Sequence, residues 1–409
     1  MEGVVRLQSE VAAVDRFSIL LTRFFAVLIL LVFLASPSFA FGELLGLGTR
    51  DQVINLNRKL GGQILDFTNN HDGDHRLHSA ALNEKRDLYV YLPPGYDGEK
   101  QFPGVLFLHG LGHDEKKFLD VVPMFDDAIR SGKLPPVIIV APDGSVTGKP
   151  SLFNAGSFYI NSKAGRFADH VMDEVWPFAK RTFTIRPERD AHVICGASMG
   201  GFGAFNLAFK NRQEFGHIVG LMPPLNLRYC DCDGRYLAVY DPNCVGLRTI
   251  ERRNEVVGRF YGVVLIRSRR MMDPIVGRLN PDATAFIANE NPFEMLTNYN
   301  IKPGEFNMFI GYGKKDEFNI DAEIEHFLDE ATRKGISADV VVLPEGRHNI
   351  KTAIEMFPPL TVWLTDKVAK YTPLDYAISP PVPAPHASGP LARVRESLSP
   401  LRSLRATLP

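Results

Sequence analysis

The sequence HVICGASMGGFGAF, residues 192–205, joins a short apolar run to a stretch of helical periodicity through the pattern Gly-x-Ser-x-Gly. A strand before this pattern and a helix after it distinguish a nucleophile elbow from a chance match. The elbow is a sharp, strained turn that presents the hydroxyl of Ser198 above a sheet. Gly196 and Gly200 flank the serine because a Cβ at either position would clash with neighbouring backbone. The stretch therefore predicts an α/β fold with a nucleophilic serine.

Apolar runs alternate with helical patterns on both sides of this stretch, which is typical of an α/β fold with a mostly parallel sheet flanked by helices. Eight runs are predicted as strands: 62–68, 86–92, 104–108, 136–141, 192–195, 217–221, 306–310 and 338–343. Amphipathic helices are predicted over 118–130, 166–181, 199–209, 321–334 and 350–370. The last helix must kink or restart at Pro358-Pro359.

A serine hydroxyl is a weak nucleophile until a base, itself held in one tautomer, takes its proton. In hydrolases of this fold the chain order is serine, acid, histidine. The run 306–310 leads into a Gly-containing loop that carries Asp316, and the run 338–343 leads into a loop that carries His348. We therefore predict Ser198, Asp316 and His348 as the catalytic residues. The adjacent Glu317 is the alternative source of the carboxylate.

The run 104–108 ends in His109-Gly110-Leu111-Gly112-His113, at the position of an oxyanion loop. We expect the backbone N–H groups of Leu111 and Met199 to bind the developing oxyanion. His109 and Gly110 are interpreted as structural residues of this loop, and His113 as a residue at the rim of the site.

Composition excludes several classes of protein. Lys and Arg number 46 against 47 Asp and Glu, so the net charge of −1 gives no basic excess for binding nucleic acid. The content of 45% hydrophobic and 23% charged residues excludes a largely disordered chain. Four cysteines in 409 residues exclude a scaffold built on disulfides.

The two ends are predicted to lie outside the folded domain, which we place at residues 41–372. Residues 24–35 are apolar but too few to span a bilayer of about 30 Å comfortably, and Ser38-Phe39-Ala40 offers small residues for a cleavage site. We expect residues 1–40 to be a signal peptide of a secreted or periplasmic protein. An uncleaved membrane anchor is the alternative, because acidic residues offset the basic ones before the apolar run. Residues 373–409 are predicted to be a disordered, Pro-rich tail.

Four blocks resemble the putative esterase family: residues 89–97, the Leu108-His-Gly110 loop, residues 141–144 and residues 196–203. That family groups S-formylglutathione hydrolases, feruloyl and acetyl-xylan esterases, enterochelin esterases and secreted mycolyltransferases. The resemblance extends from about residue 60 to residue 370 and implies an α/β-hydrolase fold. It also implies a triad of Ser198, Asp316 and His348, with no cofactor. A metal site is not expected, because Cys230 and Cys232 have the spacing C-x-C rather than C-x-x-C and no fourth ligand is evident.

The resemblance implies a serine ester hydrolase that works through an acyl-enzyme, and the predicted signal peptide makes it an exported one. Its substrate would be a carboxylic ester, carbohydrate-linked, with a feruloyl, acetyl or similar small acyl group. An acyltransferase that passes the acyl group to a sugar or lipid acceptor is the alternative. A serine peptidase and a non-catalytic binding protein on the same fold are less favoured.

Residues 221–294 depart from the compact family pattern and are predicted to form a cap-like insertion beside the site. From Arg228 to Arg278 there are ten arginines, no lysine and six acids, a net charge of +4. These arginines have three possible roles. They bind an anionic group of the substrate, they form a solvated face with ion pairs, or they contact an envelope or polymer surface. Cys244 could form a disulfide with Cys230 or with Cys232, and Cys195 is expected to be a core thiol.

Overall fold

The computed structural model describes residues 49–70, 73–150, 156–250, 254–260, 264–278, 280–374 and 376. The chain divides into two units, Met1–Asn55 and Leu56–Pro409. Of the first unit the structure describes residues 49–55, which belong to helix α3 (Thr49–Asn57). The predicted signal peptide lies outside the described residues, as does the predicted tail apart from residues 373, 374 and 376. Within the described ranges, no helix combines the length and the apolar character needed to cross a membrane.

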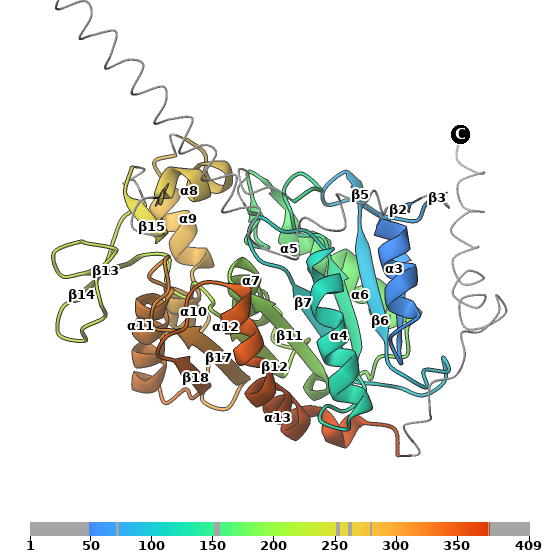
Figure 1. Cartoon of the computed structure of the whole chain (residues 1–409). Helices are drawn as coiled ribbons and strands as arrows, with labels where there is room; N and C mark the ends of the chain where they lie inside the picture. Colours follow the sequence, from blue (N-terminus) through green and yellow to red (C-terminus); the bar gives the residue numbers. More distant parts are fainter. Residues whose placement is uncertain are drawn as a thin grey trace, which may run out of the picture. The chain divides into compact units, whose positions relative to one another are not determined.

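Eight strands of the described part of the chain form one sheet in the second unit (Figure 1). Their order is β1 (Gln63–Phe67), β6 (Leu88–Leu92), β8 (Ile138–Pro142), β7 (Gly104–Leu108), β11 (His192–Ala197), β12 (His217–Leu221), β17 (Asn307–Gly313) and β18 (Asp339–Leu343). Strand β6 pairs antiparallel with β1 and β8, and all other neighbours are parallel. Each strand overlaps one predicted run. The predicted α/β fold with a mostly parallel, eight-stranded sheet is therefore confirmed.

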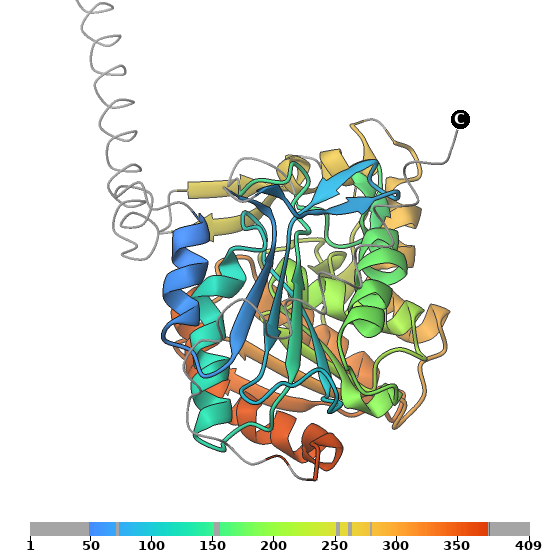
Figure 2. The ribbon, with the colours of Figure 1, turned by 90° about the vertical axis from the view of Figure 1, so that its right-hand side faces the viewer.

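Helices cover both faces of this sheet, which is why its central strands are continuous apolar runs. Helix α4 (Lys117–Arg130) lies on one face and helix α6 (Trp176–Thr182) on the other (Figure 2). The helix predicted over 166–181 consists of α5 (Phe167–Asp169), a π-helical turn (His170–Val175) and α6. The helix predicted over 321–334 is α11 (Ile320–Arg333).

The helix predicted over 350–370 is broken, as expected, but before the prolines. Helix α12 (Ile350–Glu355) ends, and α13 (Phe357–Val368) begins after Met356. Pro358 and Pro359 then occupy the first turn of α13. Proline is tolerated there because the first turn of a helix does not use its N–H groups for intrahelical bonds.

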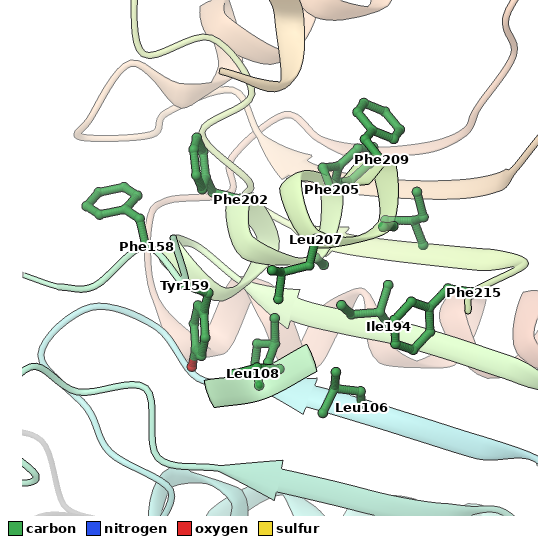
Figure 3. Packing of buried hydrophobic residues seen from close by; sticks show 14 of the residues in the cluster. Leu106, Leu108, Phe158, Tyr159, Ile194, Phe202, Phe205, Leu207, Phe209 and Phe215 are labelled. Atoms are coloured by element: carbon green, nitrogen blue, oxygen red, sulfur yellow. The ribbon is translucent and has the colours of Figure 1, made fainter. Parts of the chain in front are cut away.

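Helix α7 (Met199–Lys210), which follows the Gly-x-Ser-x-Gly pattern, is buried on almost all sides. The side chains of Phe202, Phe205 and Phe209 are fully buried. Burial of each one contributes about 1.5–3 kcal/mol to the stability of the folded state. Figure 3 shows these three rings around the helix, with Phe158 and Tyr159 beside its first turns. A helix that is apolar all round belongs in a core, so this packing fixes the turn from which α7 starts.

Between β12 and β17 the described residues form two antiparallel hairpins and three helices. They are β13 (Tyr229–Asp231) with β14 (Val245–Leu247), β15 (Val256–Phe260) with β16 (Val264–Arg267), and α8 (Ser268–Val276), α9 (Ala283–Glu290) and α10 (Pro292–Asn298). A disulfide joins Cys232 to Cys244, one of the two pairings that the sequence left open. Cys195 and Cys230 are buried.

Short elements complete the described residues. They are β2 (Asn69–Asn70), β3 (Gly73–Asp74), β4 (Leu77–Ser79), β5 (Glu84–Arg86), β9 (Asn161–Ser162), β10 (Gly165–Arg166) and two 3₁₀ turns, Arg189–Ala191 and Ala369–Tyr371.

Gly200, in the first turn of α7, leaves no room for a side chain. A Cβ at this position would overlap the carbonyl oxygen of Leu108 and lie 2.6 Å from the carbonyl carbon of Leu108 and 2.8 Å from the oxygen of His109. We expect Gly200→Ala to lower the free energy of unfolding by about 2 kcal/mol, because the helix propensity of alanine offsets only about 1 kcal/mol of the overlap. Urea denaturation measures this loss.

Gly246→Ala is the matched control for Gly200→Ala. The nearest atom to its new Cβ is the sulfur of Cys230 at 3.4 Å, an ordinary contact distance. We expect this variant to stay within about 0.5 kcal/mol of the natural protein. Equal urea midpoints for the two variants would contradict the close approach of α7 to β7.

Candidate active site

Ser198 occupies a strained turn between β11 and α7. Its backbone has φ 54° and ψ −122°, a conformation that residues with a side chain rarely adopt. Two backbone hydrogen bonds hold the turn: the N–H of Ser198 donates to the carbonyl of Leu221 in β12 (2.8 Å), and its carbonyl accepts the N–H of Phe202 (3.0 Å). These two bonds fix the backbone from which the hydroxyl of Ser198 is presented. The residue itself is half-buried.

Three predicted residues meet through hydrogen bonds at this turn. The Nε2 atom of His348 is 2.9 Å from the Oγ of Ser198, and its Nδ1 is 2.7 Å from the Oδ2 of Asp316. Asp316 follows β17 and His348 follows β18, and these adjacent parallel strands bring their following loops to one edge of the sheet. Because the carboxylate accepts from Nδ1–H, Nε2 is left without a proton and can accept the hydroxyl proton of Ser198.

The side chains of His348 and Asp316 are shielded from water. The side chain of Asp316 is 0% exposed and that of His348 is 12% exposed. Burial by itself lowers the pKa of His348, but the adjacent carboxylate of Asp316 outweighs it and raises this pKa above its ordinary value, with a smaller effect from Glu317. The imidazole is therefore a stronger base than an isolated histidine.

The loop after β7 packs directly on the serine turn. A Cβ at Gly110 would lie 3.4 Å from the carbonyl oxygen of Ala197 and 3.7 Å from the Cβ of Ser198. The side chains of Leu111 and Met199 both cover Gly156: a Cβ there would lie 2.8 Å from Cδ1 of Leu111 and overlap the sulfur of Met199. The structure thus brings together the two residues whose N–H groups we expected to bind an oxyanion. Met199 also begins α7, where helix N–H groups lack intrahelical partners.

His109 ties this loop to the segment after β8. Its Nε2 accepts the N–H of Gly144 (2.9 Å), and its Nδ1 donates to the carbonyl of Gly110 (3.0 Å). Both ring nitrogens are therefore engaged with backbone, which is the arrangement of a bracing residue. His113 is half-buried, and its burial lowers its pKa to about 4.

Two aromatic residues that the sequence did not single out lie against the site. The ring of Phe318 packs edge-on against the ring of His348, with centroids 4.9 Å apart. The hydroxyl of Tyr159 donates to the carbonyl of His109 (3.2 Å) from a backbone with φ 56°. Phe318 could have been found because it follows Asp316 by two residues. Tyr159 lies in a loop whose sequence carries no signal for a positive φ.

Arginines of the segment 228–278 form ion pairs with nearby acids. Arg235 binds Asp231 (2.7 Å) and Asp233 (2.9 Å). Two further pairs are Arg228 with Glu294 and Arg248 with Glu255. The side chain of Arg235 is 68% exposed, whereas those of Arg228 and Arg248 are 14% and 4% exposed, so of these arginines Arg235 lies on a solvated face. Across the residues that the structure describes, no group of three His, Cys, Asp or Glu side chains is arranged to hold a metal ion.

Known proteins share the fold and parts of the sequence. The family model described as "Putative esterase" matches residues 79–335. Esterase MT1326 of Mycobacterium tuberculosis (strain CDC 1551 / Oshkosh) is 28% identical over 156 residues, which are 38% of this chain and 32% of that protein. The chain thus spans about a third of the length of this curated relative.

Solved structures are similar over most of their own length. A ferulic acid esterase superposes with a TM-score of 0.54 at 16% identity, over 76% of this chain and 99% of that one. FphF, a fluorophosphonate-binding serine hydrolase of Staphylococcus aureus, superposes with a TM-score of 0.52 at 16% identity, over 74% of this chain and 98% of that one. At this identity the likeness shows the α/β-hydrolase fold. Because the family model covers more than half of the sequence, this chain belongs to the Putative esterase family.

Proposed function

We propose that the protein is a serine hydrolase of carboxylic esters. The observation that carries this proposal is the hydrogen-bonded chain from Ser198 through His348 to Asp316, with distances of 2.9 and 2.7 Å, on a strained turn at the start of α7. A serine in this arrangement has a base within reach of its proton and a carboxylate that fixes the tautomer of that base. Membership of an esterase family supports the choice of an ester over other acyl substrates.

In the proposed mechanism, each of these residues has a defined role. The Nε2 atom of His348 takes the proton of Ser198 as Oγ attacks the ester carbonyl carbon. The N–H groups of Leu111 and Met199 hold the negative oxygen of the tetrahedral intermediate. The imidazolium then gives its proton to the leaving alcohol, and an acyl-enzyme remains on Ser198. Water, deprotonated by His348, releases the acid and restores the hydroxyl.

The substrate that we propose is an ester of a small acyl group, feruloyl, acetyl or similar, on a carbohydrate. Family membership and a fold shared with a ferulic acid esterase support this class. We also propose that the protein is exported. The apolar run at residues 24–35 and the disulfide between Cys232 and Cys244 support export, because disulfides persist in oxidising compartments.

Reaction with a fluorophosphonate probe tests the proposed chemistry. We expect the purified protein to be labelled at Ser198, as located by peptide mass spectrometry, and to hydrolyse p-nitrophenyl acetate and methyl ferulate. The reason is that the probe reacts with a serine whose proton is taken by a neighbouring base. A heat-denatured sample is the control and should remain unlabelled.

Two outcomes contradict the proposal. A folded sample that shows neither label nor turnover rules out a functional serine nucleophile. Products that carry the acyl group on an added sugar or lipid acceptor, in excess of free acid, identify an acyltransferase instead.

A further inference from the structure

Glu317, next to Asp316, binds the same histidine from another side. Its Oε2 accepts the backbone N–H of His348 (2.9 Å), while its Oε1 accepts from the guanidinium of Arg347 (2.6 Å). The side chain of Glu317 is 11% exposed. Two consecutive carboxylates therefore hold one histidine, Asp316 at its ring and Glu317 at its main chain.

The loop that carries His348 depends on such contacts because it is open to solvent. Residues 344–349 join β18 to α12, and Pro344, Glu345, Arg347 and Asn349 are exposed. The N–H of Lys315 donates to the carbonyl of Gly346 (2.9 Å), which ties the two loops two residues before His348. Glu317 supplies the bond at residue 348 itself.

The hairpin of β15 and β16 also holds Glu317. The backbone N–H of Arg259, in β15, donates to the carbonyl of Glu317 (2.8 Å). The next residue of the same strand, Phe260, packs its ring against Phe318 at a centroid distance of 5.0 Å. The segment 316–318 is thus fixed between the inserted hairpin and His348.

We propose that Glu317 is a positioning residue for His348: it fixes the backbone from which the imidazole reaches Ser198, and it holds a negative charge beside this residue. This inference rests on the proposed function. Charged groups that face the imidazole are the carboxylates of Asp316 and Glu317, and Arg347 is bound to Glu317. The ring also contacts Ser198 and Phe318, which are uncharged. A displacement of the catalytic base by about 1 Å lowers the reaction rate by up to about 10²-fold.

Glu317→Ala and Glu317→Gln test the two parts of this role with p-nitrophenyl acetate as substrate. We expect Glu317→Ala to lower kcat by about 10- to 100-fold with KM within twofold, because the backbone anchor is lost. Glu317→Gln keeps an oxygen for the N–H of His348, so its kcat should recover to within about fivefold of the natural enzyme.

The pH profile separates this role from a merely structural one. Hydrolysis needs neutral His348, and nearby negative charge raises the pKa of this group. Removing the charge of Glu317 stabilises the imidazolium less, so the acid limb of kcat/KM should move to lower pH in both variants. A loss of folded protein alone would lower the amplitude of the profile without moving its limb.

Glu345→Ala is the matched control. Glu345 lies in the same loop as His348, is paired with Lys315, and its side chain is 82% exposed. This variant should retain the natural kcat and acid limb. Glu317→Ala with the kcat and acid limb of the natural enzyme overturns the inference, and so does Glu317→Gln with an unmoved limb. Failure of the proposed function is distinct, because it shows as absent labelling and turnover in the natural protein.

Discussion

Ser198→Ala is expected to lower kcat for ester hydrolysis by about 10⁴-fold or more, because the acyl-enzyme cannot form without Oγ. The backbone of the turn keeps its bonds to Leu221 and Phe202, so the protein should remain folded. Initial rates with p-nitrophenyl acetate measure the loss, and the fluorophosphonate label should disappear with it.

Ser131→Ala is a suitable control for this result. Ser131 follows α4, where its hydroxyl donates to the carbonyl of Ala128 (3.2 Å), away from the three site residues in sequence and element. This variant should keep its rate. A Ser198→Ala protein that retains a tenth of the natural activity would show that another group is the nucleophile.

Asp316→Asn is expected to lower kcat by about 10⁴-fold because it reverses the tautomer of the base. The Oδ1 atom of Asp316 accepts the N–H of Phe318 (2.8 Å), so an asparagine must place its amide oxygen there. Its NH₂ group then faces Nδ1 of His348, which can only accept from it. The proton moves to Nε2, and the base can no longer take the proton of Ser198. Steady-state rates at the pH optimum measure the effect.

Comparison with Glu317→Gln decides between the two neighbouring acids. If Asp316→Asn stays within tenfold of the natural rate while Glu317→Gln falls by 10³-fold, then Glu317 is the carboxylate that orients the base. The contacts described above predict the opposite order, because Asp316 binds the ring and Glu317 the main chain.

The central sheet was predictable because its strands obey a strong rule. A parallel sheet covered on both faces requires continuous apolar runs, and 104–108 and 217–221 match β7 and β12 to the residue. The serine turn was predictable for a related reason. A Cβ at Gly196 or Gly200 would overlap neighbouring backbone atoms. Glycine at these two positions therefore indicates that the backbone segments of the turn lie close together.

The contacts of Glu317 were not predictable because adjacent Asp and Glu offer the same chemistry to sequence reasoning. Their roles differ because their side chains leave the backbone in different directions. The N–H of Phe318 binds the carboxylate of Asp316, and the N–H of Arg259 binds the carbonyl of Glu317, so both residues are held in place. The disulfide partner of Cys244 was open for the same reason. Cys230 and Cys232 lie two residues apart, and the path of the β13–β14 hairpin decides between them.

The positive φ of Ser198 has an evolutionary consequence. At φ 54° a serine holds a conformation that costs of order 1–3 kcal/mol and that glycine adopts without steric penalty. Selection for stability alone would therefore favour glycine at position 198, and selection for a reactive hydroxyl opposes it. A descendant of this chain that no longer needed its chemistry would gain stability by losing the serine, so the residue at this position records whether the chemistry is still under selection.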